Sequence, residues 1–341
     1  MLHEKQALTK NAKLSKGIKP MIGGIKMLER NAYGSIPIDE MKDLITTVYV
    51  IVDDMYQKHT PEKVINRLHN DKAILSDSEI ITISIMGEIM SNDSEKAWLS
   101  FVSRNLRDLF PRMLERSRFN RVRRNLTQII GHIRFCLNQY LELGMADLRI
   151  VDSAPLQVCE FGRACFHRLF KGYGASYGVC PSKKITYYGY KVHALCAENG
   201  VITDFIVSSA DIDDREAVWE LVETYNHHLW LIGDKGYISA RLANDLRNEN
   251  GVSLIYMKRD NAKDQYPKQF RQAMFKIRRR IETSFSQLAD QFNMETTRAK
   301  SFWGLLCRLH TKILAYNLCF YINQLLGRPF NDLAKIKSLI F

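Results

Sequence analysis

An apolar run that ends on an aspartate constrains this chain more than any other stretch. Residues Trp230–Gly233 lead into Asp234, and Lys235-Gly236 then interrupts the apolar pattern. The stretch predicts a short buried strand that ends on a carboxylate and is followed by a turn. Because Asp and Gly are common turn residues, this segment alone does not assign chemistry to Asp234.

Charge and composition narrow the class of partner. Lys and Arg number 49 against 37 acidic residues among 341, which gives a net charge of +12. Such a positive field favours a polyanionic partner, most simply nucleic acid. No apolar run approaches the roughly 20 residues that span a bilayer, and the first residues show no secretory pattern. The seven cysteines include no Cys-x-x-Cys pair. We therefore expect a cytoplasmic protein with no membrane partner.

The first part of the chain divides into an extension and a helical region. Residues 1–39 are lysine-rich and lack periodicity, which is typical of a flexible basic extension. Residues 40–145 carry helical periodicity, with a capping box at Ser76 and Glu79. One helix is predicted over Arg121–Leu141. We interpret residues 40–145 as an all-helical DNA-binding region.

A cluster of arginines within 112–124 supports that interpretation. The segment contains six arginines and only one acid, Glu115. Guanidinium groups suit phosphate contacts, and asparagine suits base-edge contacts. The alternative is an ordinary solvated helix face with ion pairs along it. The residues predicted to contact DNA here are Arg116, Arg118, Asn120 and Arg121.

From residue 146 the pattern changes to alternating strands and helices. A strand is predicted to end at Asp152 and to stop at Pro155, followed by a long loop over 157–185. Residues 186–196 and 201–208 then predict a hairpin around Glu198-Asn199-Gly200. The predicted order over 146–295 is three strands, then helix, strand, helix, strand and helix. This order describes an α/β domain with a mixed sheet.

Three acids are expected to meet in this domain. A right-handed crossover places the first and fourth predicted strands side by side, so Asp152 and Asp234 would face one crevice, and Glu282 would be added from the last helix. Three carboxylates repel one another, and two bound divalent cations would remove that penalty while supporting in-line phosphoryl transfer. Oxygen ligands favour Mg²⁺, with Mn²⁺ as a substitute.

Other basic residues of this domain are candidates for DNA contacts, each with a structural alternative. Arg278 precedes Glu282 by one helical turn and either meets a phosphate or forms an i,i+4 ion pair; Arg279 enlarges the same basic patch. Lys235 follows Asp234 and binds a phosphate or lies in a solvated turn. Lys191 and His193 share one strand face, and His193 is alternatively an ordinary half-buried histidine. Residues 296–341 predict an apolar helix for core or dimer packing.

Several of these segments together resemble the DDE transposases of bacterial insertion sequences, and among them the insertion sequence 982 family. The similar segments are Leu75–Ile80, Ser117–Arg121, Val151–Pro155, Tyr188–His193, Gly233–Tyr237 and Arg279–Phe285. The resemblance implies a ribonuclease-H-like mixed sheet flanked by helices, two Mg²⁺ ions, and Asp152, Asp234 and Glu282 as catalytic and metal-binding residues. Phe275 and Ala289 stand where related transposases carry tyrosine and lysine.

The predicted function is DNA transposition. The protein would cut at terminal inverted repeats and join the 3′-hydroxyl ends to target DNA, acting as a homodimer on double-stranded DNA at the bacterial nucleoid. Two alternatives stay open. One is a metal-dependent nuclease of the same fold that only hydrolyses, and the other is a catalytically decayed copy that only binds DNA.

Overall fold

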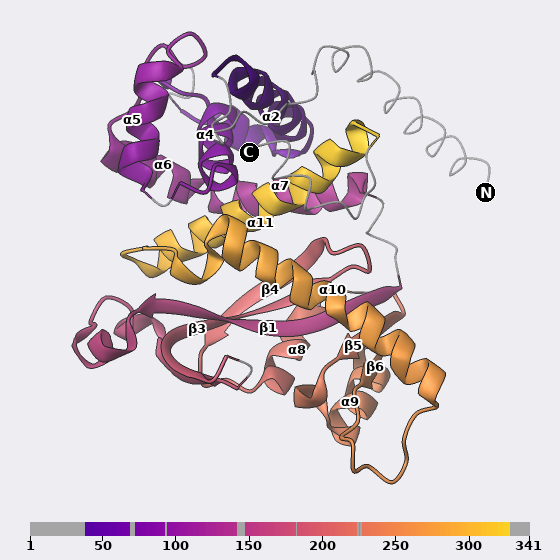
Figure 1. Cartoon of the computed structure of the whole chain (residues 1–341). Coiled ribbons are helices and arrows are strands. Elements are labelled where there is room, and N and C mark those ends of the chain that lie inside the picture. Colours follow the sequence, from indigo (N-terminus) through magenta and orange to yellow (C-terminus); the bar gives the residue numbers. More distant parts are fainter. Residues whose placement is uncertain are drawn as a thin grey trace, which may run out of the picture.

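A computed structural model describes residues 38–327, except 69–71, 93, 142–146, 182, 224 and 226. The predicted extension 1–39 and the predicted boundary near 145 therefore lie almost wholly outside the described residues. Helices form the first part of the described chain, which is drawn in indigo to purple in Figure 1. They are α2 (Ile38–His59), α3 (Glu62–Ile65), α4 (Asp77–Ile89), α5 (Glu95–Asn105), α6 (Arg116–Asn125) and α7 (Thr127–Tyr140).

The capping box at the start of α4 is confirmed. The Glu79 amide donates to Ser76 Oγ at 3.1 Å, and the Ser76 amide donates to Glu79 Oε2 at 2.6 Å. The single helix predicted over Arg121–Leu141 is wrong, because the chain breaks at Leu126. The buried Leu126 has φ −87° and ψ 3°, outside the helical region, and separates α6 from α7. α6 and α7 are therefore two separate helices on either side of Leu126.

A six-stranded mixed sheet forms the second part of the chain. Its strands are β1 (Leu148–Cys159), β2 (Ser176–Cys180), β3 (Ile185–Cys196), β4 (Ile202–Ser209), β5 (Leu229–Gly233) and β6 (Val252–Tyr256). The order is β2-β3-β1-β5-β6, and β4 pairs with the same edge of β3 as β2. β1 runs antiparallel to β3 and parallel to β5, as the predicted crossover requires.

Two predictions for the segment after Asp152 are wrong. β1 continues through Pro155 to Cys159, and the predicted loop over 157–185 contains β2. β1 pairs with β5 only over Leu148–Ile150, so its β5-facing edge is free of strand pairing at Pro155. Proline is tolerated there because no partner strand needs its missing N–H.

Helices cover both faces of the sheet (Figure 1). On one face lie α10 (Lys268–Phe292) and α11 (Phe302–Leu325); on the other lie α8 (Asp214–Val222) and α9 (Ala240–Asn250). α10 is anchored by Ser284, whose hydroxyl donates to the Gly200 carbonyl at 2.8 Å in the β3–β4 hairpin. α10 thus lies across β1 with Glu282 in its middle.

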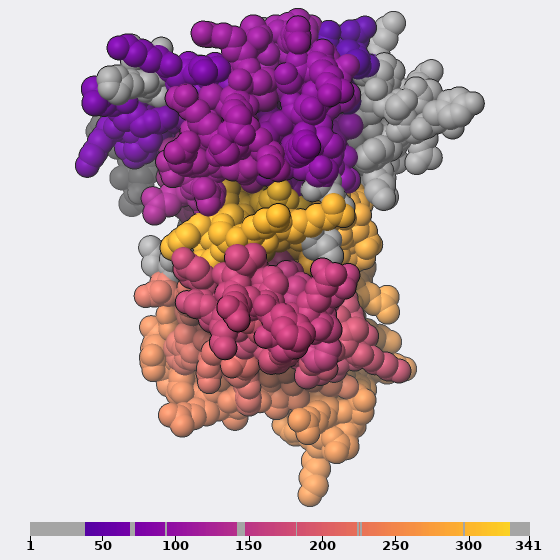
Figure 2. All heavy atoms as spheres, turned by 90° about the vertical axis from the view of Figure 1, so that its left-hand side faces the viewer, coloured from indigo at the N-terminus to yellow at the C-terminus, as the bar shows by residue number. Residues whose placement is uncertain are grey.

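α11 joins the helical region to the sheet. In the outer edge of β4, the Ile202 carbonyl accepts a hydrogen bond from Asn317 Nδ2 at 2.7 Å, and the Ile202 amide donates to Asn317 Oδ1 at 3.3 Å. Figure 2 shows α11 as a yellow band between the purple helices and the pink sheet strands. One hydrophobic cluster contains buried side chains from α2, α4–α7, β1, β3, α10 and α11. Across the described ranges, none of the helices combines the length and apolarity that crossing a bilayer requires.

Candidate active site

The strand register brings Asp152 and Asp234 together. Ile150 of β1 pairs with Ile232 of β5 in the parallel ladder. Two residues later on each strand come Asp152 and Asp234, and period-two alternation puts each on the same face as its isoleucine. That face is the one α10 covers, since Ile232 packs with Met274 of α10. The strand register therefore places the two aspartates on one face of the sheet, as predicted.

The electrostatics of Asp152 agree with this closeness. Burial, and after it the neighbouring charge of Asp234, raise the pKa of its carboxyl to about 7. The backbone amide of Ser153 donates to Asp152 Oδ1 at 2.8 Å and opposes the shift. A carboxylate whose charge is destabilised by burial and by a second carboxylate favours a bound proton or a cation beside it.

Arg278 of α10 links the acids. Its Nη1 lies 3.8 Å from Asp152 Oδ2, and its Nη2 forms a short ion pair with Glu282 Oε1. Arg278 is 19% exposed, whereas Glu282 is 47% exposed at the surface of the helix. The guanidinium thus supplies positive charge between a sheet carboxylate and a helix carboxylate. The i,i+4 ion pair, one of the two alternatives for Arg278, is present.

The donor chemistry of the three acids fits a hard divalent cation, because all their ligand atoms are carboxylate oxygens. In this structure, however, the three acids do not form a preformed metal site. Within the described residues, no group of three or more His, Cys, Asp or Glu side chains is placed to hold a metal ion. Glu282 is engaged by Arg278. Arg278 thus contacts both Glu282 and Asp152 and offsets part of their negative charge.

The turn after β5 fixes Asp234. Asp234 Oδ1 accepts a hydrogen bond from the Gly236 amide at 2.7 Å. A Cβ placed on Gly236 would lie 2.9 Å from the same oxygen, and a Cβ on Gly233 would lie 2.8 Å from the ring of Tyr237. Tyr237 is fully buried, and the charges of several nearby aspartates, Asp214 first, add to the burial that raises its pKa. The two glycines therefore let the chain fold tightly around the carboxylate.

Asp214 is a fourth acid near the site that sequence reasoning missed. Its charge contributes to the raised pKa of Asp152. Lys191 Nζ donates to Asp214 Oδ1 at 3.1 Å, and His193 Nδ1 lies 3.6 Å from the same oxygen. Asp213-Asp214 reads in sequence as a helix N-cap, and Asp213 does cap α8. Nothing in that pattern distinguishes a second role for Asp214.

Lys191 and His193, both predicted to contact DNA, lie inside this polar cluster. His193 is fully buried, and its Nε2 is 2.8 Å from Ser208 Oγ. Burial lowers the pKa of His193 to about 4, so the imidazole is neutral at neutral pH. Lys191 also donates to the Ile212 carbonyl at 2.6 Å. Both side chains are engaged within the protein.

The remaining predicted DNA contacts fall into two groups. Arg116, Arg118 and Arg121 are exposed on α6, and Arg279 is exposed on α10. Two others have internal partners. Lys235 pairs with Asp260 at 3.3 Å. Asn120 Nδ2 donates to Glu95, and Asn120 Oδ1 accepts from Arg123 Nη2 at 3.1 Å. The role of each in DNA binding stays a prediction.

Comparison with known protein families identifies the sheet region of this chain. Residues 144–302 match the family model described as a transposase DDE domain. The matched segment contains Asp152, Asp234 and Glu282 but covers less than half of the chain. Searches of curated proteins and of solved structures found no match. The family match and the two adjacent aspartates support a DDE transposase.

Proposed function

We propose that this protein is a DNA transposase whose catalytic centre is formed by Asp152, Asp234 and Glu282. The observation that carries the proposal is the β1–β5 register, which sets Asp152 beside Asp234 under α10. It lies within the segment that matches a transposase DDE domain. The resemblance of the surrounding motifs to the insertion sequence 982 family agrees with this assignment.

The three carboxylates would hold divalent cations, proposed as two Mg²⁺ ions or Mn²⁺ in their place. When bound, such ions lower the pKa of an attacking hydroxyl and stabilise the leaving oxygen in phosphoryl transfer. The contribution of this chain is to hold the ligands. Asp152 and Asp234 are fixed by amide hydrogen bonds from Ser153 and Gly236. Glu282 comes from α10, whose anchor at Ser284 is described above.

Positive side chains near the acids would orient the DNA. Arg278 and Arg279 lie on α10 beside Glu282, and the exposed arginines of α6 offer further phosphate contacts. Arg278, freed from Glu282, would meet a backbone phosphate next to the scissile bond. The proposed substrates are the inverted repeats of the element and a target duplex. Because two ends must be joined, we propose at least a homodimer on DNA.

A strand-transfer assay tests the proposed function. Labelled duplexes taken from inverted repeats beside the gene are mixed with plasmid DNA and Mg²⁺ or Mn²⁺. The proteins are the wild type, Asp234→Asn, and Asp260→Asn as a matched control on an exposed acid near the same turn. Joined product is expected from the wild type and Asp260→Asn but not from Asp234→Asn.

The other outcomes separate the alternatives. Cleavage without joining, lost in Asp234→Asn, would show a nuclease that only hydrolyses. DNA binding with neither reaction under both metals would show a decayed copy. Joined product from Asp234→Asn at the wild-type rate would remove Asp234 from the catalytic centre.

A further inference from the structure

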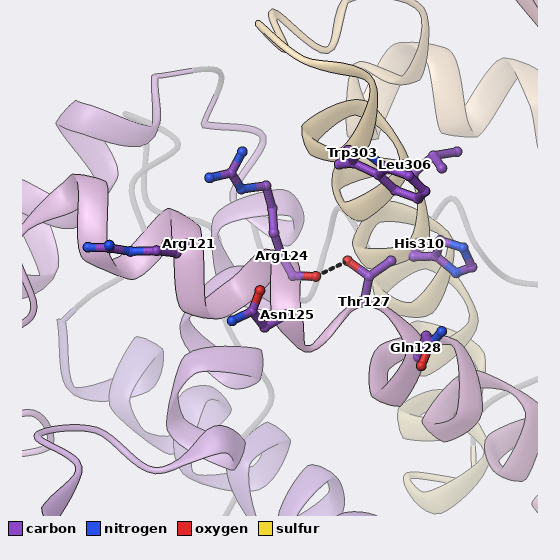
Figure 3. A pocket seen from close by; sticks show the side chains of 8 residues that line it. All are labelled: Arg121, Arg124, Asn125, Thr127, Gln128, Trp303, Leu306 and His310. Atoms are coloured by element: carbon purple, nitrogen blue, oxygen red, sulfur yellow. Dashed lines mark hydrogen bonds between the residues drawn. The ribbon is translucent and has the colours of Figure 1, made fainter. Parts of the chain in front are cut away.

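A hollow lies apart from the acid cluster, where α6 and α7 meet the start of α11. Its volume is about 560 Å³. Figure 3 shows residues of the α6–α7 junction on one side and residues of α11 on the other. The lining residues are Arg121, Arg124, Asn125, Thr127, Gln128, Trp303, Leu306 and His310. The hollow thus combines an aromatic and aliphatic wall with guanidinium and amide groups.

Two arginines of this hollow have free guanidinium groups. Arg121 and Arg124 are exposed, and neither side chain has a hydrogen bond or ion pair within the described part of the chain. Their neighbour Arg123 differs, because it is buried and pairs with Glu95 at 3.1 Å. Glu95 also accepts from Arg308 of α11 at 2.9 Å, so the charge of this acid is already balanced by two arginines. The positive charge of Arg121 and Arg124 remains available to an anionic ligand.

The Trp303 ring forms an aromatic wall of the hollow, and neighbouring contacts fix the segment that carries it. It is 60% exposed in the first turn of α11, which is capped by Ser301. Its neighbour Phe302 stacks on Tyr173 with ring centroids 5.3 Å apart, and the Phe302 and Trp303 rings meet edge to face at 5.6 Å. These contacts hold the start of α11 against the segment before β2. An exposed aromatic ring in a fixed position beside guanidinium groups provides a surface on which a base can stack.

The chemical groups that line the hollow indicate which kind of ligand fits it. A phosphate alone would use the arginines but not the indole, and bases inside a duplex are stacked and cannot reach an aromatic side chain. An unpaired nucleotide uses both, because its base stacks on an aromatic ring while its phosphates meet guanidinium groups. The exposed amides of Asn125 and Gln128 add donors and acceptors for a base edge.

We propose that this hollow binds an unpaired nucleotide of single-stranded DNA, with the base against Trp303 and the phosphates against Arg121 and Arg124. The choice of DNA as the nucleic acid rests on the proposed function. Binding at the hollow does not require the acids, so it is measurable in the Asp234→Asn background. There, loss of cleavage does not affect the result.

The test compares single-stranded and duplex oligonucleotides by fluorescence anisotropy, using full-length Asp234→Asn protein. Adding Trp303→Ala is expected to weaken single-strand binding about 5- to 100-fold and duplex binding about twofold or less. Trp303→Phe keeps a stacking ring and is expected to restore most of the affinity. Trp230→Ala, which removes an indole that is 45% exposed on β5, is the matched control and should change neither.

Two further measurements test where the base and the phosphates bind. A 2-aminopurine in the single strand should be quenched on binding, and Trp303→Ala should abolish the quenching. Replacing Arg121 and Arg124 by alanine should reduce the salt dependence of single-strand binding by about 0.7 per lost phosphate contact. Arg241→Ala, on a 92% exposed side chain of α9, is the control.

Three results would overturn the proposal. Equal single-strand affinity for Trp303→Ala and Trp230→Ala would exclude stacking on Trp303. Equal losses for duplex and single strand would assign the hollow to duplex backbone. Competition by an acidic peptide as strong as that of an oligonucleotide of equal charge would assign it to a protein partner. If strand transfer fails but the stacking signals persist, the proposed function fails and this site stands.

Discussion

At the scale of single residues, the acid cluster follows from a short list of positions. The apolar run before Asp234 and the alternating strand before Asp152 are visible in the sequence, and pairing of their strands was predictable from crossover handedness. The contacts of Asp214, Asn120 and Lys235 were not predictable from the sequence. Each depends on which distant element faces the side chain, and local spacing carries no such information.

The raised pKa of Asp152 predicts a pH-dependent stability difference. Asp152→Asn is expected to gain stability relative to wild type as the pH rises from about 4 to about 7 in metal-free buffer. The folded carboxyl has a pKa of about 7, against an ordinary 3.8, so the folded wild type binds the extra proton in this range. It then loses at most about 1.4 kcal/mol per pH unit, and the asparagine variant does not.

The measurement is thermal unfolding of both proteins across that range with a chelator. Only their difference isolates Asp152, because His193 acts in the opposite direction. Its folded pKa of about 4 lies below the ordinary 6.5, so its contribution is present above pH 6.5 and is lost on acidification. A difference between wild type and Asp152→Asn that stays constant with pH would contradict the assigned environment.

Gly236→Ala tests how the turn holds Asp234. The new Cβ would lie 2.9 Å from Asp234 Oδ1 and would push the carboxylate out of place. We expect metal-dependent DNA cleavage to fall at least about tenfold, because small displacements at an active site are costly. The melting temperature should change little, since Gly236 is exposed. Gly172→Ala, where the Cβ meets open space, is the control. Normal cleavage by Gly236→Ala would contradict this account.

At the scale of elements, boundaries that depend on packing were the hardest to predict. The capping box of α4 is a local signal and was correct. The helix break at Leu126 carries no Gly or Pro, and the residue at which the backbone leaves helical geometry is buried in the core. β1 runs through Pro155 because its free edge tolerates proline there. Such outcomes depend on neighbouring elements that a local pattern does not contain.

A buried ion pair fixes the relative positions of three helices. Lys312 of α11 is 4% exposed; its Nζ pairs with Glu88 of α4 and donates to the Phe292 carbonyl at the end of α10. Lys312→Met leaves Glu88 without its cation and is expected to cost about 3–5 kcal/mol of unfolding free energy. The exposed pair of Lys58 and Asp54 is the control, and Lys58→Met should cost under about 1 kcal/mol.

Urea unfolding of the two variants measures the difference. Combining Lys312→Met with Glu88→Leu should recover most of the loss, because no unpaired charge then remains buried. Equal stability of Lys312→Met and Lys58→Met would show that the pair does not join these helices.

At the scale of the whole molecule, the helical region and the sheet share one core. The cluster that contains α2 and α4–α7 also contains β1, β3, α10 and α11. In the sequence, helical periodicity changes to strand periodicity near residue 146, which by itself suggests two separate regions. Packing does not follow the same division, since α11 contacts α4 and α7 as well as the sheet hairpin.

This shared core predicts one cooperative unfolding transition for the full chain. A fragment limited to residues 144–302, the matched segment, lacks α11 and the first helices and would expose one side of that core. We expect the fragment to show no cooperative transition by calorimetry. Two separate transitions in the full chain, or a cooperative fragment, would contradict the account.

Binding of Mn²⁺, followed by its electron paramagnetic resonance signal, tests the central claim most directly. The claim is that Asp152, Asp234 and Glu282 together bind the proposed divalent cations once Arg278 releases Glu282. The account predicts saturable binding to the wild type and to Asp260→Asn, and its loss in Asp152→Asn and in Asp234→Asn. Equal binding by all four proteins would place the metal elsewhere and would contradict the proposed catalytic centre.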